Sequence, residues 1–279
     1  KPYGLLYESI QLFRQPHASF PYILQDSCTN SLIRIYSRMV SCSFVAMTCA
    51  ATFLFSSLES CATGTCFILF YLSLLRSYQD KRAPGIAFYS FACLGIASLF
   101  FVQILYFVPF LWILMASNMM ALTHRMFWAT VLGLVMPYWF AVGYYVVTNQ
   151  FDAFIDHFAE LAQFEPLLQY EALDIHRIAT FGLVVLLAVI GIIHYMRNSY
   201  QDKIRTRMIF EMFITVDILS FVFIILQPQH FDNLLPIIIV NTSCLFAHYV
   251  ALTRTWLTNV TFIVMCLATL GLTIFNLMP

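Results

Sequence analysis

Long uncharged apolar runs dominate the chain and limit what it can fold into. Residues 84–122, for example, contain no charged side chain. A membrane-spanning helix needs about 20 consecutive, mostly apolar residues, and nine segments of the chain approach that length. We therefore predict an all-α fold, a polytopic transmembrane helical bundle with about nine spans. The predicted spans are residues 35–56, 60–76, 84–102, 104–122, 126–148, 177–197, 205–226, 234–252 and 256–276.

The composition supports a membrane protein and argues against a soluble domain. Of the 279 residues, 61% are hydrophobic and 10% are charged, whereas soluble domains carry about 25% charged residues. Lys plus Arg equals Asp plus Glu, with 14 of each, so the net charge gives no indication of nucleic acid. The expected partner is the lipid bilayer, with no nucleic-acid partner.

Basic residues recur after every second predicted span, which predicts an orientation. Connections rich in Lys and Arg stay on the cytoplasmic side of a membrane. The alternate connections hold SSLES, the acidic stretch 149–175 and QPQHFDN, so we expect these to face outward. The basic connections contain Arg34, Arg38, Arg76, Lys81, Arg82, His124, Arg125, Arg197, Lys203, Arg205, Arg207 and Arg254.

An internal duplication is indicated by the pentapeptide SYQDK, which occurs at 77–81 and again at 199–203. Residues 77–101 and 199–223 align without a gap and share 10 of 25 positions. Chance matches are frequent in apolar sequences, which use few residue types, and they explain the matching Phe residues. They do not explain the identical polar pentapeptide. We predict a parallel tandem repeat of four-helix units, residues 57–148 and 177–279, an arrangement known among transporters.

Two segments lie outside the predicted repeat units and their spans. Residues 1–30 contain Pro and polar residues and begin with Lys1, so we expect an interfacial segment or the remainder of a truncated N-terminal segment before the first span, 31–56. Residues 149–176 form an outward-facing amphipathic helix in our prediction. Its apolar stripe suggests that 151–165 lies on the membrane surface or docks a protein partner. The stripe consists of Phe151, Phe154, Ile155, Phe158, Leu161 and Ala162.

The opposite stripe of that helix is acidic, with Asp152, Asp156 and Glu160. Together with His157, Asp156 and Glu160 have the residue types that bind a divalent cation, but a solvated acidic face is the favoured interpretation. The cysteines lack the spacing of a zinc site, and the chain has no GxGxxG, Walker, HExxH or GxSxG motif. We therefore expect no metal and no cofactor.

Asp217 is the most informative single residue, because it lies near the middle of a predicted span. A charged side chain there costs about 2.5–3.5 kcal/mol on insertion scales. It indicates a proton or cation site or a substrate contact, unless a neutral Asp simply bonds to another helix. Asn241 and His248 lie seven residues apart and share one helical face, so we predict an intramembrane polar cluster of Asp217, Asn241 and His248. The alternative for His248 is a packing residue.

Two runs, FYSFACLGIASLFFVQILYFVPFLWI (88–113) and HRMFWATVLGLVMPYWF (124–140), carry a resemblance. Over about residues 65–145 the chain is similar to a family of uncharacterised polytopic inner-membrane proteins of Bacteroidetes. The resemblance implies a multi-pass protein of the bacterial inner (cytoplasmic) membrane and transfers no catalytic residue. The spacing of short paired helices also resembles membrane glycosyltransferases that use polyprenyl-phosphate sugars. Those enzymes work at an outward-facing acidic residue in an early loop, and Glu59 is the only residue here that fits that position.

Three functions follow from these features. The first is a non-catalytic transport unit or a subunit of a cell-envelope complex, indicated by the repeat and the amphipathic helix. The second is a polyprenyl-phosphate-sugar-dependent, glycosyltransferase-like enzyme that joins Glu59 to the acidic residues of 149–175. The third is a proton- or cation-coupled carrier centred on Asp217. Catalytic residues, substrate and oligomeric state are not determined by the sequence.

Overall fold

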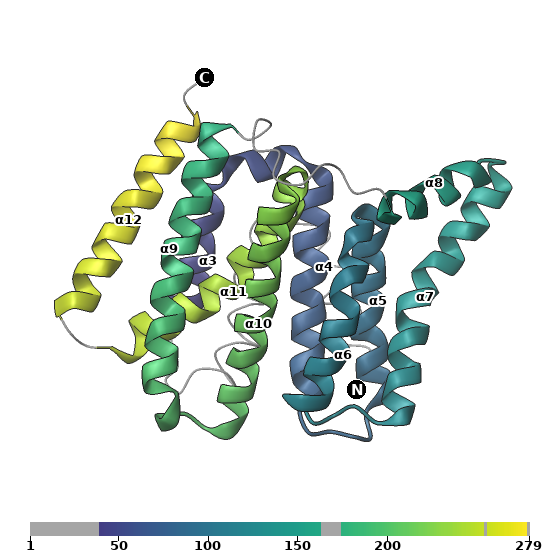
Figure 1. Ribbon diagram of the computed structural model, residues 1–279, viewed down its shortest axis with the longest axis horizontal. Coiled ribbons are helices and arrows are strands. Elements are labelled where there is room, and N and C mark those ends of the chain that lie inside the picture. Colours follow the sequence, from purple (N-terminus) through teal and green to yellow (C-terminus); the bar gives the residue numbers. More distant parts are fainter. Residues whose placement is uncertain (1–38, 163–173, 254–255, 278–279) are drawn as a thin grey trace.

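The computed structural model describes residues 39–162, 174–253 and 256–277, and every regular element in these ranges is a helix (Figure 1). This confirms the all-α fold class. Residues 1–30, with Arg34, Arg38 and Arg254, lie outside the described ranges. The elements are α3 (Met39–Ala50), η1 (Thr52–Ser56), α4 (Leu58–Leu74), η2 (Leu75–Ser77), α5 (Pro84–Phe100), η3 (Val102–Phe107), α6 (Val108–Ser117), α7 (His124–Val147), α8 (Phe151–Ala162), α9 (Ile175–Asn198), η4 (Ser199–Gln201), α10 (Ile204–Leu226), η5 (Pro228–His230), α11 (Phe231–Leu252) and α12 (Trp256–Leu277).

Six helical stretches in the described part of the chain are long and apolar enough to cross a membrane. They are Leu58–Ser77, His124–Val147, Ile175–Gln201, Ile204–Leu226, Pro228–Leu252 and Thr258–Asn276. Three further apolar helices are shorter, so nine spans are not established. The break at Phe101, where the backbone is extended (φ −139°, ψ 91°), ends α5, and Pro109 lies in the first turn of α6. The apolar run 84–122 is therefore divided into two helices by a break in backbone conformation, although its hydropathy is continuous.

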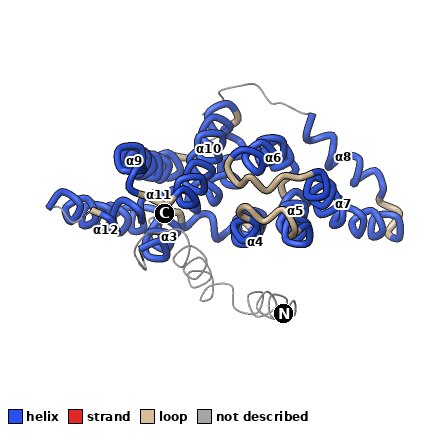
Figure 2. Tube along the Cα trace, turned by 90° about the horizontal axis from the view of Figure 1, so that it is seen from below, coloured by secondary structure: helices blue, strands red, loops and turns tan. Residues whose placement is uncertain are grey.

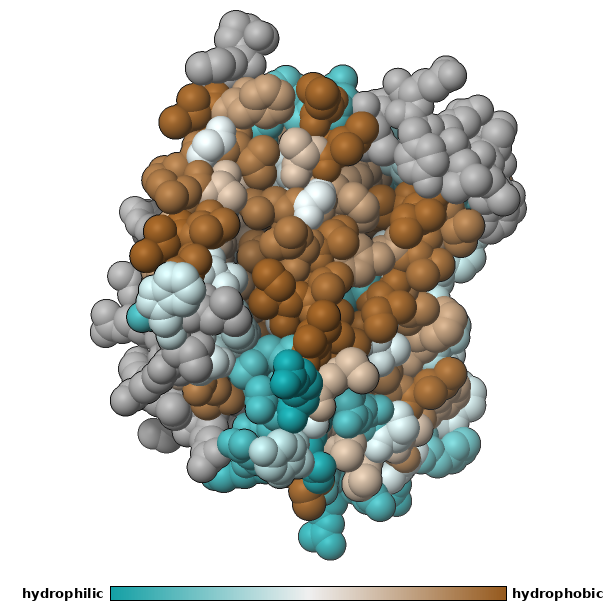
Figure 3. Space-filling view, turned by 60° about the vertical axis from the view of Figure 1, so that its left-hand side comes forward, coloured by the Kyte–Doolittle hydropathy of each residue, from teal (hydrophilic) through white to brown (hydrophobic). Residues whose placement is uncertain are grey.

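Apart from Asp217, the charged residues of the described ranges lie toward the two ends of the bundle. One end, called the basic end below, holds Arg76, Lys81, Arg82, Arg125, Arg197, Lys203, Arg205 and Arg207, with Asp80, Asp202 and Glu211. The other, the acidic end, holds Glu59, Asp152, Asp156, Glu160, Asp174 and Asp232, with Arg177. Figure 3 shows a broad hydrophobic surface between a hydrophilic lower end and a few hydrophilic residues at the top. Such a surface suits a bilayer.

Helix α11 is the centre of the bundle and packs against α3, α4, α9 and α10. Within its spanning window 83% of residues are buried, against 17% for α7 and for α12. Viewed end-on, the helices form an elongated array with α12 at one end and α7 near the other (Figure 2). The outer helices therefore present apolar side chains to lipid, and α11 is shielded from it.

Helices α5 and α7 cross closely at two glycines. A Cβ atom on Gly133 would overlap the backbone oxygen of Phe88, and one on Gly95 would lie 2.6 Å from the backbone oxygen of Leu134. Small residues let helix backbones approach in membranes, where van der Waals packing drives helix association. This crossing attaches α7 to the bundle, since α5 is its main neighbour.

Residues 58–147 and 175–277 have the same order of elements, with a 3-10 turn after the first and second helix of each. Arg205, two residues after the second SYQDK segment, contacts the first segment and the residues before it at the basic end. The Arg205 guanidinium donates to the backbone oxygen of Leu75 (3.2 Å) and lies 5.4 Å from the centre of the Tyr78 ring. The packing of the last helices differs, however, because α7 packs on α5 whereas α12 packs on α3 and α9.

We expect Gly133→Val to lower the free energy of unfolding by about 1–3 kcal/mol, as overpacking does in a close contact. The control is Gly143→Val on the same helix, where an added Cβ meets no atom within 4 Å. Unfolding in mixed micelles measures both. Equal stability of the two variants would contradict the close crossing.

Orientation is tested with single cysteines in a cysteine-free background. Lys81 and Asp156 are exposed at the basic and acidic ends. If the basic end is cytoplasmic, an impermeant maleimide added to intact cells should label Asp156→Cys, and Lys81→Cys only after permeabilisation. The reverse pattern would contradict the predicted orientation.

Candidate functional site

Asp217 lies near the middle of α10, and 0% of its surface is exposed, so no water-sized space reaches it. The hydroxyl of Thr242, on α11, donates to Asp217 Oδ2 at 3.2 Å. Asp217 Oδ1 has no hydrogen-bond partner in the part of the chain that the structure describes. Within the described ranges, this carboxyl in the middle of a candidate membrane-spanning helix thus has one hydrogen bond, from a neutral donor.

Asn241 and Tyr71 complete what we call the central polar cluster: Tyr71, Asp217, Asn241 and Thr242. Asn241 lies against both the Asp217 carboxyl and the Tyr71 hydroxyl, at geometries short of a hydrogen bond. Both amide atoms of Asn241 and the Tyr71 hydroxyl are buried and have no hydrogen-bond partner within the described ranges. Buried polar atoms without partners are rare and call for a functional or hydration role.

The cluster joins parts of the chain that are distant in sequence. Tyr71 comes from α4, Asp217 from α10, and Asn241 and Thr242 from α11. The Tyr71 ring packs edge-on against Phe213 with centroids 5.0 Å apart. A Cβ on Gly64 of α4 would lie 2.8 Å from Pro236 of α11, so these two helices are in close contact nearby. The cluster therefore lies between the first and second predicted repeat units.

His248 forms a separate pair with Asp202, which we call the basic-end pair. His248 Nε2 and Asp202 Oδ2 are 3.0 Å apart, and the side chains are 0% and 2% exposed. His248 Nδ1 has no hydrogen-bond partner among the described residues. The structure thus brings Asp217 and Asn241 together, but places His248 with Asp202 instead of in the same cluster.

Sequence reasoning missed Thr242, Tyr71 and the pairing of Asp202. In the sequence Asp202 stands out only as part of the repeated pentapeptide, as one more charged residue beside Lys203. Its partner lies 46 residues away, a contact that no local pattern encodes. Thr242 and Tyr71 are ordinary in composition, and only the packing of α4 and α10 on α11 gives them a role.

The acidic-end candidates are exposed and are not brought together. Glu59 lies in the first turn of α4, and Asp152, Asp156 and Glu160 lie on the exposed face of α8. The opposite face of α8 packs on α7. Its partners there are Phe154 against Tyr145 and Phe158 against Tyr138. His157 turns toward the Ser98 backbone oxygen at 3.0 Å.

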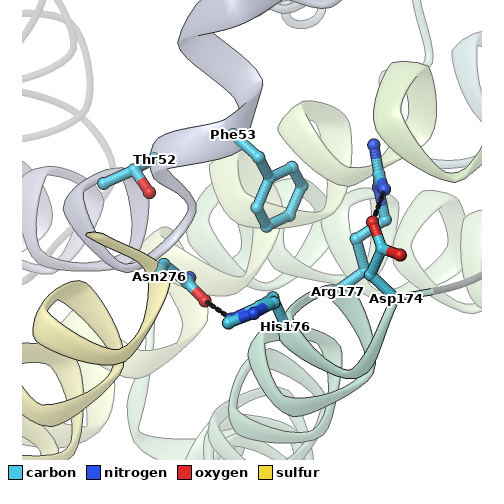
Figure 4. A pocket seen from close by; sticks show the side chains of 6 residues that line it. All are labelled: Thr52, Phe53, Asp174, His176, Arg177 and Asn276. Atoms are coloured by element: carbon cyan, nitrogen blue, oxygen red, sulfur yellow. Dashed lines mark hydrogen bonds and ion pairs between the residues drawn. The ribbon is translucent and has the colours of Figure 1, made fainter. Parts of the chain in front are cut away.

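A cavity of about 390 Å³ opens at the acidic end beside α9 (Figure 4). It is lined by Thr52, Phe53, Asp174, His176, Arg177 and Asn276. Two hydrogen bonds of 2.9 Å join Arg177 to Asp232, and a 2.5 Å bond joins it to Asp174. His176 Nδ1 lies 3.1 Å from Asn276 Oδ1.

Arg177 and His176 already make hydrogen bonds within the protein. The cavity therefore has few polar groups left to bind a ligand. Glu59 does not line it, so the outward pocket that the enzyme hypothesis requires does not include that residue. No pattern in the sequence indicated a role for Arg177, because Arg177 is the first residue of a predicted span.

Among the described residues, no group of three or more His, Cys, Asp and Glu side chains could hold a metal ion.

Comparisons of the chain with protein-family models, curated proteins and solved structures returned no match. The resemblance to inner-membrane proteins of Bacteroidetes therefore stays a prediction.

Thr242→Val keeps the shape of the side chain and removes the only donor to Asp217 Oδ2 found in the described structure. We expect it to lower the free energy of unfolding in micelles by about 0.5–2 kcal/mol. The control is Ser243→Ala, whose hydroxyl donates to Val240 within α11 at 2.7 Å, and which should cost less. Equal losses would show that the hydrogen bond to Asp217 is not stabilising.

Proposed function

We propose that this protein is an integral inner-membrane transport unit in which the central polar cluster couples transport to a proton or a cation. The supporting observation is the complete burial of Asp217 among neutral groups. An ionised carboxylate with no cationic partner is very costly in an apolar interior. A carboxyl there is compatible with stability mainly when it carries a proton or binds a cation.

The unpartnered atoms of the cluster support a second state. A purely structural network is expected to satisfy its members, because a half-satisfied buried network costs more than an apolar core. Here the Tyr71 hydroxyl, the Asn241 amide and Asp217 Oδ1 lack partners within the described chain. They are available to a water, a cation or a substrate in a conformation that admits one.

The position of the cluster supports the same function. It lies where α4 meets α10 and α11, between the two segments whose shared element order and shared pentapeptide favour a parallel repeat. Transporters built from repeats bind their substrates and ions near the midplane, at the interface between repeats. The basic end would face the cytoplasm.

A subunit of a cell-envelope complex is the second candidate. Phe151 and Ile155 of α8 are 45% and 53% exposed, which leaves part of its apolar stripe for lipid or a protein partner. Phe154 and Phe158 are engaged by α7, so the surface that remains is small. The coupling function has the stronger support.

The coupling site is tested by infrared difference spectroscopy of the protein in nanodiscs, titrated with acid and, separately, with Na⁺. We expect a carboxyl C=O band that changes with one of these ions and is missing in Asp217→Asn. The control is Glu211→Gln on the same helix, at an exposed carboxylate that accepts from Asn118 at 3.0 Å. A wild-type spectrum with no Asp217 band that responds to either ion would contradict the proposal.

A further inference from the structure

The basic-end pair lies between the central polar cluster and the basic end of the bundle. Asn241 and His248 are both on α11, seven residues apart, which is two helical turns or about 10 Å. Asp202 follows η4, between the exposed residues Gln201 and Lys203. The pair thus connects the interior of α11 to a segment that meets solution.

Two phenylalanines of α10 fill the space between the pair and the cluster. Phe210 packs 4.7 Å from the His248 ring and stacks on Tyr195 at 5.5 Å. Phe213 packs against Phe210 at 6.0 Å and against Tyr71 of the cluster at 5.0 Å. Both Phe side chains are fully buried, so they separate the Asp217 carboxyl from His248 in this conformation.

The charged and titratable groups near His248 come from several elements. They are His194, Tyr195 and Arg197 of α9, Asp202 after η4, and Arg207 and Glu211 of α10. Tyr71 of α4 lies farther along α11, next to Asn241. Of these, Asp202 makes the direct contact with an imidazole nitrogen, while the Tyr195 hydroxyl is engaged with the Arg207 backbone oxygen at 3.0 Å. Asp202 is therefore the charged group in direct contact with His248.

We propose that His248 and Asp202 form the proton-exchange site through which Asp217 equilibrates with solution at the basic end, with Phe210 and Phe213 as the closed gate. The inference rests on the proposed function and identifies its coupling ion as the proton. An ionised Asp202 accepts a hydrogen bond from His248 Nε2–H, which leaves Nδ1 as the nitrogen with a lone pair. Nδ1 is the atom that has no hydrogen-bond partner among the described residues.

The proton transfer balances without another reactant. When the gate opens and water enters, the Asp217 O–H bond breaks, its proton passes through water, and an N–H bond forms at His248 Nδ1. The imidazolium then releases its Nε2 proton to the Asp202 carboxylate, which passes it to solution. Histidine suits this role because its charge changes between about pH 5 and 8.

A proton fits the central cluster better than a metal cation does. Asp217, Asn241 and Thr242 are each 0% exposed, so no space for an ion adjoins them in this conformation. A sodium or calcium ion needs several oxygen ligands around a cavity of its own size. A bound proton needs one oxygen and no cavity.

The other copy of the pentapeptide lacks this relay and supplies the controls. Asp80 corresponds to Asp202, but it is exposed and accepts from the Arg82 backbone N–H at 2.8 Å. Asn118 corresponds to His248 and donates to Glu211. The first copy therefore has an Asn where the second has His248. The variant His248→Asn gives the second copy the same residue as the first.

The test follows the Asp217 C=O band after a rapid pH jump, with the full chain in nanodiscs. We expect protonation of Asp217 to slow by at least about tenfold, as for loss of an acid–base relay, in His248→Asn and in Asp202→Asn. The rate should also lose its dependence on pH in the range where imidazole titrates. Asp80→Asn, the matched control, should behave as wild type.

The outcomes separate this inference from the proposed function. No ion-sensitive Asp217 band in the wild type overturns both. A band that responds to pH but moves at the wild-type rate in both pair variants overturns the relay alone, as does a band that responds only to Na⁺. If neither variant folds, ¹⁵N-histidine NMR of the wild type decides: a His248 signal that stays constant between about pH 5 and 8 overturns the relay.

Discussion

The absence of water in the bilayer interior is the constraint on which the rest of this structure depends. Polar and ionisable side chains in a membrane face the interior of the helix bundle, and here they gather on the helix that lipid does not reach. Helix α11 carries Asn241, Thr242, Ser243 and His248, all of them buried. The outer helices α7 and α12, by contrast, present Trp139, Leu267 and similar side chains outward. The burial of α11 is therefore what permits polar chemistry in this chain.

Much of the fold could be predicted from two simple patterns, the lengths of the apolar runs and the alternation of charge between them. Each predicted segment contains a helix in the described structure. The lengths were harder to predict, because hydropathy does not show where the backbone departs from helical geometry. At Phe101 an extended residue interrupts an apolar run, and α5, which ends there, is shorter than a span requires.

The candidate site was predictable only where polarity is conspicuous. Asp217 stands out in an apolar run, and the seven-residue spacing placed Asn241 and His248 on one face of α11. Which side chains they meet depends on how helices pack, so Tyr71 of α4 and Asp202 after η4 gave no signal. The predicted three-residue cluster is consequently divided between two sites along the same helix, one central and one near the basic end.

One further consequence follows from the glycine at position 95. In the proposed duplication Gly95 and Asp217 occupy equivalent positions, and they give their helices different contacts. Gly95 lets α5 and α7 interlock backbone to backbone, a contact with no side chain that could change its state. Asp217 instead accepts a hydrogen bond from Thr242 of α11, and its Oδ1 has no partner in the part of the chain that the structure describes. In that duplication, one substitution at this position separates a copy with a close backbone contact from a copy with a buried ionisable side chain.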